Sequence, residues 1–473
     1  SVGADTLINV SRVRGSDFAD TLLGSNGTDF EQFRGEAGDD IIDGRGGTND
    51  QADYITSVNG VSVNLATGIA TDGLGGTDTL SNIERIQGSD HNDTLIGDAN
   101  DNIIESRFGF DILIGGAGDD TLKGLVRDVP QQDSTRVDYT SATGGINVVM
   151  SAKGTVTGDA SVGTDTLDNV DAVFGSAFAD TYLADDLHSG HFNNFNEFQG
   201  GAGNDIITGS GSTRVRYIDA TSGVTVDLSA GGAVGDASVG TDTLINVNRI
   251  KGSTFADTLL GTDGSGFEEF RPRGGNDFID GRDGTNDEIR YQSAPTGITV
   301  NLSTGVAVDG FGGTDTLAGI ERIRASNHDD VLTGDANNNL FRPGSGSDTI
   351  DGGGGTDTID YLRFTFNDPA AGVTVNLASG LATDGGGFTD TLTSIENVRG
   401  TDFNDTITGN SADNSIFGDD GVDTIIGSAG NDILQGSSNV ELIGINYSVV
   451  DYSAGTLALT VTGSTSVGTA SGA

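Results

Sequence analysis

A nine-residue period that returns an acidic or amide side chain among glycines constrains the fold of this chain more than any other feature. Between Gly88 and Lys123 the sequence divides into GSDHNDTLI, GDANDNIIE, SRFGFDILI and GGAGDDTLK. The eighth position is always apolar. Nine is a poor period for a helix, and so many glycines would destabilise one. A short strand with one inward apolar residue, followed by a glycine-rich turn, fits the period. We therefore predict that two nonapeptides close one coil of about 18 residues.

The period recurs in three stretches, 88–123, 325–360 and 400–435. Residues one coil apart should lie one strand spacing apart, so we expect Asp93 beside Asp111 and Asn102 beside Asp120. Glycine permits positive-φ turns, which leave carbonyl oxygens exposed. Carbonyls and carboxylates together make an all-oxygen site, which suits Ca²⁺ better than Zn²⁺ or copper. The sixth-position residues are Asp93, Asn102, Asp111 and Asp120, then Asp330, Asn339, Asp348 and Asp357, then Asp405, Asn414, Asp423 and Asp432.

These nonapeptides resemble the RTX (repeats-in-toxin, hemolysin-type) calcium-binding family, whose pattern is Gly-Gly-x-Gly-x-Asp-x-apolar-x. Full matches are Gly115, Gly116, Gly118 and Asp120, and Gly352, Gly353, Gly355 and Asp357. Partial matches are Gly344, Gly346 and Asp348, Gly418, Gly421 and Asp423, and Gly427, Gly430 and Asp432. The resemblance implies an all-β, right-handed parallel β-roll or β-helix with Ca²⁺ in its Gly/Asp turns. It also implies secretion to the cell exterior or surface by a type I machinery.

Three pairs of aspartates depart from the regular spacing. An insertion must bulge from the coil, so we predict weaker calcium sites at these pairs than in the regular blocks. The separations are 20 residues for Asp20–Asp40 and for Asp257–Asp277, and 25 residues for Asp180–Asp205.

The composition restricts the partners of the chain. Its formal net charge is −47, with 70 acidic and 23 basic residues. Such acidity argues against binding nucleic acid or an anionic membrane surface. A solvated acidic face, or adaptation to high salt, would also give this charge, but neither requires one aspartate per nine residues beside glycine. Because the chain has no cysteine, calcium is the candidate cross-link in place of disulfides. No apolar run approaches the roughly 18 residues of a membrane span.

A larger repeat lies above the nonapeptides. Six Asp-Thr-Leu openings recur, and the last five follow a tyrosine and a strand-like alternation such as Val61, Val63 and Leu65. We predict one continuous solenoid over 1–473, with units of about 1–72, 73–159, 160–236, 237–309, 310–384 and 385–463, and a further unit starting at 464–473. The openings begin at Asp5, Asp78, Asp165, Asp242, Asp315 and Asp390, and the two pairs Asp5–Asp242 and Asp78–Asp315 are each 237 residues apart. Three units thus resemble a duplicated block, and we expect tandem repeats to continue beyond both ends.

The chain offers little sign of catalysis. It has no HExxH, GxSxG or phosphate-loop motif, and acids at regular spacing are typical of a scaffold. Glycosidase-like chemistry in a groove is the weaker alternative. We expect His91 and His328 to pack in turns; His188 and His191 are a weak candidate for a transition metal.

The sequence therefore predicts a calcium-binding, structural or adhesive segment of a large secreted bacterial surface protein. A biofilm-matrix adhesin, a surface layer and a fibre are examples of such proteins. Its expected partners are calcium ions, further repeats or neighbouring copies, and surface polysaccharide. The alternative is the non-catalytic calcium-binding module of a secreted protease, lipase or polysaccharide-modifying enzyme.

Overall fold

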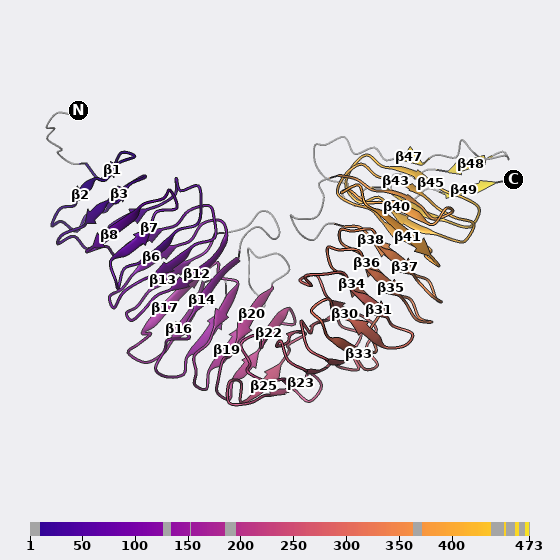
Figure 1. Cartoon of the computed structure of the whole chain (residues 1–473), viewed down its shortest axis with the longest axis horizontal. Helices are drawn as coiled ribbons and strands as arrows, with labels where there is room; N and C mark the ends of the chain where they lie inside the picture. The colour runs from indigo at the N-terminus through magenta and orange to yellow at the C-terminus, as the bar shows by residue number, and fades with distance from the viewer. Residues whose placement is uncertain are drawn as a thin grey trace. The chain divides into compact units, whose positions relative to one another are not determined.

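The computed structural model describes residues 10–125, 134–151, 153–184, 195–362, 371–436, 449–450, 459–462 and 469–472. Within these ranges the chain forms strands and no helix (Figure 1). It divides into two compact units, Ser1–Gly284 and Thr285–Ala473. In each unit the strands lie in two sheets with mainly parallel pairing. The predicted all-β, parallel β-roll class is confirmed.

The strands are two to five residues long, and many of the three-residue strands bury only their middle residue. Those of the first unit are β1 (Arg12–Arg14), β2 (Thr21–Leu23), β3 (Glu31–Arg34), β4 (Ile41–Asp43), β5 (Asp50–Asp53), β6 (Ser62–Asn64), β7 (Ile69–Thr71), β8 (Thr77–Ser81), β9 (Arg85–Gln87), β10 (Thr94–Ile96), β11 (Ile103–Glu105), β12 (Phe110–Ile114), β13 (Thr121–Lys123), β14 (Ser134–Asp138), β15 (Asn147–Met150), β16 (Lys153–Thr157), β17 (Thr164–Asp168), β18 (Ala172–Phe174), β19 (Thr181–Ala184), β20 (Asn196–Gln199), β21 (Ile206–Thr208), β22 (Thr213–Arg216), β23 (Thr225–Asp227), β24 (Gly232–Val234), β25 (Thr241–Ile245), β26 (Arg249–Lys251), β27 (Thr258–Leu260), β28 (Glu268–Arg271) and β29 (Phe278–Asp280).

The second unit continues the same pattern. Its strands are β30 (Asp287–Arg290), β31 (Thr299–Asn301), β32 (Val306–Val308), β33 (Thr314–Ala318), β34 (Arg322–Arg324), β35 (Val331–Thr333), β36 (Leu340–Arg342), β37 (Thr349–Asp351), β38 (Thr358–Asp360), β39 (Thr374–Asn376), β40 (Leu381–Thr383), β41 (Thr389–Thr393), β42 (Asn397–Arg399), β43 (Thr406–Thr408), β44 (Ser415–Phe417), β45 (Thr424–Ile426), β46 (Ile433–Gln435), β47 (Val449–Val450), β48 (Leu459–Thr462) and β49 (Thr469–Gly472).

Successive nonapeptides alternate between the two sheets, so strands 18 residues apart are neighbours. Strands β10 and β12 pair in parallel with Thr94 opposite Ile112. Strands β11 and β13 pair in the same way with Ile103 opposite Thr121. The eighth-position residues point between the sheets and form the core, where Leu95, Ile104, Leu113 and Leu122 are fully buried. The predicted coil and its apolar ladder are both present.

Within the described ranges, five of the large repeats also contain a reversed strand, which the sequence did not reveal. Strand β7 lies antiparallel between β6 and β8, with Ala70 opposite Val63 on one side and Asp78 on the other. The outer two strands of this meander pair in parallel with the coils on either side, β8 with β4 and β6 with β10. The same meander recurs as β15–β17 and β23–β25 in the first unit, and as β31–β33 and β39–β41 in the second.

One additional strand changes the sheet in which the meander lies. Strands β6–β8 belong to one sheet, and β15–β17 belong to the other. Among the described residues, six strands separate β8 from β15, whereas five separate β17 from β23. Because strands alternate between the sheets, one more strand moves the next meander to the opposite side. The longer Asp78–Asp165 repeat, compared with Asp165–Asp242, reflects this additional strand.

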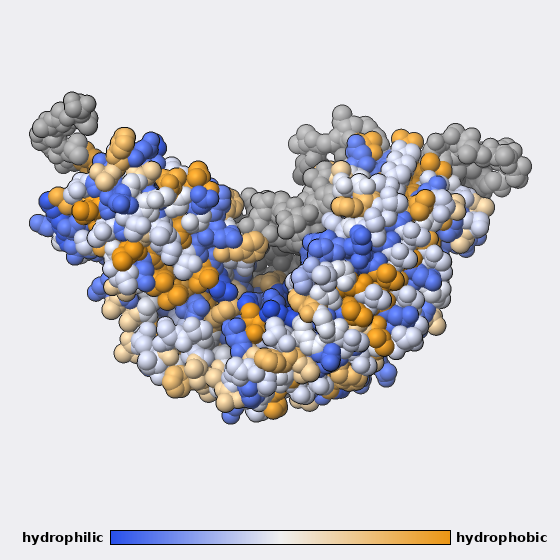
Figure 2. Space-filling view, in the orientation of Figure 1, coloured by the Kyte–Doolittle hydropathy of each residue, from blue (hydrophilic) through white to orange (hydrophobic). Residues whose placement is uncertain are grey.

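Polar and apolar side chains are interspersed on the surface (Figure 2). The part of the chain that the structure describes has no helix of the length and apolarity that a membrane crossing requires.

Candidate metal centre

The sixth-position side chains form stacks along the coils. The backbone N–H of Asp93 donates to Oδ1 of Asp111 at 2.9 Å, and that of Asn102 donates to Oδ1 of Asp120 at 2.7 Å. Each carboxylate thus reaches back to the preceding coil, as expected. The other regular blocks contain the same bond in Asp330–Asp348 (2.8 Å), Asn339–Asp357 (2.7 Å), Asp405–Asp423 (3.1 Å) and Asn414–Asp432 (3.0 Å).

The three interrupted pairs keep the same contact. Asp20 N–H donates to Asp40 Oδ1 at 2.7 Å, although 20 residues separate them. The strands that follow remain in register, with Thr21 opposite Ile41. The two-residue insertions of Asp20–Asp40 and Asp257–Asp277 therefore bulge from the other half of the coil and leave these acids stacked. The remaining interrupted pairs are Asp180–Asp205 (2.9 Å) and Asp257–Asp277 (2.7 Å).

A longer acid occupies the half-coil that contains a two-residue insertion. Glu31 Oε2 accepts the N–H of Ser25 at 2.7 Å, and Glu268 Oε2 accepts that of Thr262 at 3.0 Å. Asp93 and Asn102 each accept the N–H of the residue four positions earlier, and here glutamate spans six residues. Sequence reasoning missed this replacement, although a glutamate beside each insertion was its signal.

The first glycine of each nonapeptide provides the space for the carboxylate. A Cβ on Gly115 would lie 2.2 Å from Asp120 Oδ2. A Cβ on Gly97 would lie 2.3 Å from Asn102 Oδ1 and 2.1 Å from the carbonyl oxygen of Gly115 in the next coil. Both distances are far below van der Waals contact. The missing side chain therefore leaves a side-chain oxygen and a carbonyl oxygen facing the same small space. Equivalent contacts occur at Gly88, Gly334, Gly352, Gly400 and Gly418.

Two classes can be distinguished among the buried aspartates at the sixth position of the nonapeptides. In the capped class a Ser or Thr four residues earlier binds both carboxylate oxygens. Ser89 donates its N–H to Asp93 Oδ2 and its hydroxyl to Oδ1, both at 2.7 Å. In the open class Oδ2 is buried and has no hydrogen-bond partner. The capped aspartates are Asp93, Asp180, Asp257, Asp330 and Asp405. The open ones include Asp40, Asp120, Asp205, Asp348 and Asp357.

The backbone four residues before the acid separates the two classes. Before the open Asp120, Gly116 has φ +105°, and before Asp205, Gly201 has φ +83°. Ser89 of the capped class is absent from the positive-φ residues. We attribute the open Oδ2 to this left-handed residue, whose N–H does not reach the carboxylate. The second glycine of the motif thus determines whether an oxygen is open. Gly344 and Gly353 take the same conformation before Asp348 and Asp357, as does Glu36 before Asp40.

Burial makes the negative charge of the open class costly. It raises the pKa of Asp120 to about 7, and Asp165 contributes to the shift. It raises the pKa of Asp205 to about 8, where Asp242 and Asp180 contribute. For Asp348 burial and then Asp390 raise the pKa to about 8. A buried carboxylate in this state requires either a proton or a nearby cation. The stacks are therefore suited to bind one.

Comparison with known families agrees with this geometry. The RTX calcium-binding nonapeptide repeat (4 copies) matches residues 78–113, 106–125, 193–213, 315–350, 324–359 and 399–434. These segments are RTX calcium-binding nonapeptide repeats. Most of the predicted site residues lie in them, whereas the pairs Asp20–Asp40 and Asp257–Asp277 lie outside. No curated protein matches the chain. RTX repeats are in general structural calcium-binding modules and not catalytic ones.

The RTX turns fit a hard cation through mixed ligands. No three acidic or histidine side chains in the described ranges are grouped closely enough to hold a metal by themselves. An ion must therefore draw on carbonyl oxygens as well, as Ca²⁺ sites commonly do. The open Oδ2 of Asp120 and the neighbouring carbonyls supply this oxygen-only chemistry.

The remaining sequence candidates have other roles or lie elsewhere. The backbone N–H groups of His91 and His328 donate to Ser89 and Ser326, and both residues are exposed in turns. This agrees with turn packing. His188 and His191 lie outside the described residues.

Proposed function

We propose that this chain is a calcium-binding structural segment of a secreted surface or matrix protein, in which Ca²⁺ holds neighbouring coils together. The observation that carries the proposal is the open Oδ2 of Asp120 and its equivalents, buried beside glycines that leave room for an ion. The anchoring ligands are the open aspartates. The capped aspartates, and the sixth-position asparagines Asn102, Asn339 and Asn414 of adjacent nonapeptides, provide further ligands or hold the turn in place.

The charge of the chain supports a role for calcium in folding. At −47, the coils repel each other unless cations neutralise the stacked acids. The glycine-rich chain also loses much conformational entropy on ordering. Binding of Ca²⁺ to the folded coils alone would stabilise them by mass action. Extracellular calcium modules bind with dissociation constants of about 10⁻⁴ to 10⁻³ M, so millimolar calcium should suffice.

The first experiment compares open and capped acids in the full chain. Asp120→Asn, Asp348→Asn and Asp357→Asn should each reduce the number of calcium ions bound in equilibrium dialysis. Asp93→Asn, Asp330→Asn and Asp405→Asn remove the same charge from capped positions and are the matched controls. Equal stoichiometry in all six variants would contradict the assignment. A second comparison, Asp120→Asn against Asp40→Asn and Asp205→Asn, tests whether interrupted coils bind calcium more weakly.

The second experiment concerns folding and architecture. Circular dichroism should show loss of β-structure after thorough chelation, and an unchanged spectrum would contradict calcium-dependent folding. We further propose that the six repeats form one continuous solenoid, because the sequence repeats in tandem and a three-unit block is duplicated. Small-angle scattering in millimolar calcium should then give a radius of gyration larger than the roughly 23 Å expected for a globular chain of this length.

Duplication of a whole block favours a segment that multiplies length, as in an adhesin, fibre or surface layer. Its partners would be further repeats, neighbouring copies or surface polysaccharide, and the chain itself would perform no catalysis. Export by a type I machinery follows from the RTX resemblance. The alternative is the calcium-binding module of a secreted enzyme, and sequence beyond either end distinguishes the two. More repeats support the first role, and a catalytic domain supports the second.

A further inference from the structure

Three turns outside the matched RTX segments contain an aspartate bound in an unusual way. Asp72 precedes the turn between β7 and β8, and its Oδ1 accepts the N–H groups of Leu74, Gly75 and Gly76, each at 2.8 Å. Asp309 and Asp384 occupy the same place in the β32–β33 and β40–β41 turns. Oδ1 of Asp309 accepts three N–H groups at 2.8–2.9 Å, and Oδ1 of Asp384 accepts those of Gly386 and Phe388.

The second oxygen of each of these carboxylates points inward. Oδ2 of Asp72, Asp309 and Asp384 is buried and has no hydrogen-bond partner. The three residues are only 1%, 0% and 7% exposed. The N–H groups on Oδ1 stabilise negative charge on the carboxylate. An ionised oxygen that is buried without a partner is strongly unfavourable, which indicates that a cation belongs beside it.

The other two meander turns lack this feature and serve as internal comparisons. Asp159 and Asp236 begin the β16–β17 and β24–β25 turns, but Thr143 donates its hydroxyl to Asp159 Oδ2 at 2.9 Å, and Thr221 donates to Asp236 Oδ2 at 2.7 Å. A serine two residues further on satisfies Oδ1. Both carboxylates are therefore fully hydrogen-bonded at the surface. At the same place in its repeat, the chain thus has two kinds of turn. In one kind Oδ2 of the aspartate is buried without a partner, and in the other it is hydrogen-bonded at the surface.

Additional oxygen ligands lie near the inward Asp72. A Cβ on Gly76 would lie 1.9 Å from the carbonyl oxygen of Gly38 and 2.7 Å from Asp72 Oδ2. The two oxygens therefore flank the same point. Asp40 lies close enough for its charge and that of Asp72 to repel, and its own Oδ2 is open. Two carboxylates and a carbonyl near one buried position form a ligand set for a divalent cation with oxygen preference.

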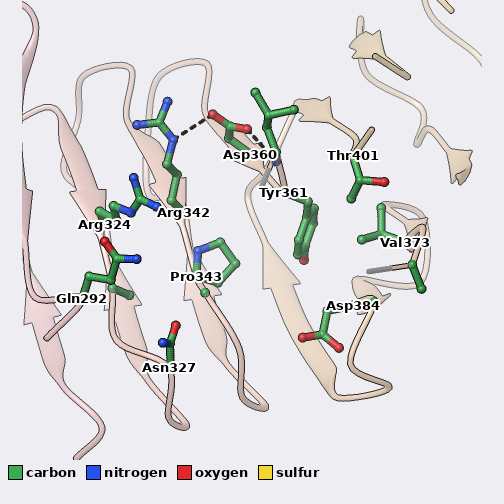
Figure 3. Close-up of a pocket in the computed structure, with 15 residues that line it drawn as sticks. Gln292, Arg324, Asn327, Arg342, Pro343, Asp360, Tyr361, Val373, Asp384 and Thr401 are labelled. Atoms are coloured by element: carbon green, nitrogen blue, oxygen red, sulfur yellow. Dashed lines mark hydrogen bonds and ion pairs between the residues drawn. The ribbon is translucent and has the colours of Figure 1, made fainter. Parts of the chain in front are cut away.

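The turn at Asp384 borders a cavity. It has a volume of about 50 Å³, and its wall includes Asp384, Tyr361, Asn327 and Thr401. The hydroxyl end of the Tyr361 ring points toward Asp384 (Figure 3). One water needs about 10–15 Å³ on the same measure, so the cavity has room for an ion with attached water. The space beside Asp384 is a second observation, separate from the unpaired Oδ2, that leaves room for a ligand.

We propose that Asp72, Asp309 and Asp384 anchor a second class of Ca²⁺ site, located in the meander turns outside the matched RTX segments. The ion binds the inward Oδ2 and fixes the reversed strand to the coil beneath it. Turns with Asp159 or Asp236 carry no ion, because serine and threonine hydroxyls replace it.

Calcium counting in the full chain tests the proposal. Asparagine keeps Oδ1 as an acceptor for the turn N–H groups and removes the charge. Asp72→Asn, Asp309→Asn and Asp384→Asn should each lose one bound Ca²⁺ by equilibrium dialysis, and the triple variant should lose three. Asp159→Asn and Asp236→Asn should lose none. A triple variant with native circular dichroism and the full calcium count would overturn the proposal.

Terbium luminescence provides a second readout that does not require the triple variant to fold. The chain has no tryptophan, so tyrosine sensitises bound Tb³⁺, and Tyr54 lies near Asp72. Asp72→Asn should lower the tyrosine-sensitised emission, and Asp159→Asn should not. Equal emission from these two variants and the parent chain would also overturn the proposal. Asp120→Asn tests an RTX site by itself. If the meander-turn variants keep all their calcium, the proposal for the RTX sites can therefore still be judged from Asp120→Asn.

Discussion

The hydroxyl of Tyr361 donates a hydrogen bond to Oδ2 of Asp390 at 2.8 Å. Both residues are buried, and they lie at the two ends of a meander, since the tyrosine follows β38 and the aspartate lies in β41. Oδ1 of Asp390 accepts the N–H of Asp348, so the Asp-Thr-Leu opening at Asp390 is bound from two sides. The bond recurs as Tyr54–Asp78, Tyr139–Asp165, Tyr217–Asp242 and Tyr291–Asp315.

Loss of one such hydroxyl should cost more than loss of a hydroxyl that binds a neutral group. We expect Tyr217→Phe to reduce the free energy of unfolding by about 1.5–3 kcal/mol, because it leaves Oδ2 of the buried Asp242 without a donor. The control is Tyr182→Phe, whose hydroxyl binds the amide oxygen of Asn196 and should cost about 0.5–1.5 kcal/mol. Urea unfolding at fixed calcium measures both, and equal losses would contradict a charged partner for Tyr217.

Two glycines of one RTX turn should differ in what they support. In Gly115→Ala the three atoms nearest the new Cβ all belong to the side chain of Asp120, the closest at 2.2 Å, so calcium affinity should fall while the chelated protein keeps its stability. In Gly118→Ala the residue has φ +116° and its Cβ meets the backbone of Asn100 at 2.7 Å, so the fold itself should be destabilised. Calcium titration and thermal unfolding in chelator separate the two effects. If Gly115→Ala destabilised the chelated protein and Gly118→Ala lowered only calcium affinity, the proposal that Gly115 provides space for the Asp120 carboxylate would be wrong.

The chelated protein should become less stable as pH rises. Burial raises the pKa of Asp78 to about 7 and those of Asp165 and Asp242 to about 6, against 3.8 for a free aspartate. Between about pH 4 and pH 7 the folded chain therefore holds more protons than the unfolded chain, and stability falls with rising pH. We expect a higher melting temperature at pH 5 than at pH 8 in chelator. Saturating calcium should weaken or reverse this trend, because calcium binds the ionised form. If the chelated protein melted at a higher temperature at pH 8 than at pH 5, the raised pKa of these buried aspartates would be contradicted.

A buried ion network on β20, β22 and β28 should show the opposite pH dependence. Burial favours the neutral form of Glu197, but Arg214 and Arg216 lower its pKa to about 2. Glu197 Oε2 binds Arg214 Nη1 at 2.9 Å, and Arg214 also binds Glu269. Glu197→Ala should cost about 3–5 kcal/mol near pH 7, and the loss should shrink as pH falls from about 4.5 toward 2. Asp90→Ala, which removes an ion pair with Arg107 from a side chain that is 47% exposed, should cause little change. Similar losses in both variants would contradict the role of burial.

The nine-residue period predicted the structural features that are the same in every coil. It predicted the coil, the inward Leu95 ladder and the contact of Asp93 with Asp111, because a fixed period fixes which residues are neighbours. It could not predict strand β7, which is three residues long and lies where the period is interrupted. The difference between Asp93 and Asp120 was also hidden, since it depends on the φ angle of the residue four positions earlier. That residue is serine in one case and glycine in the other, and only backbone geometry gives the difference its meaning.

The reversed strand has a consequence for how such a chain finds its native pairing. In a ladder of near-identical coils, a shift by one coil would leave each apolar residue and each aspartate opposite an equivalent partner, so misregistered forms would compete with the native one. Strand β7 cannot take part in such a shift, because its antiparallel pairing with β6 and β8 has no equivalent in the adjacent coils. One meander per repeat thus limits pairing errors to a single repeat, and a chain built this way can be lengthened by duplication without its errors growing in proportion.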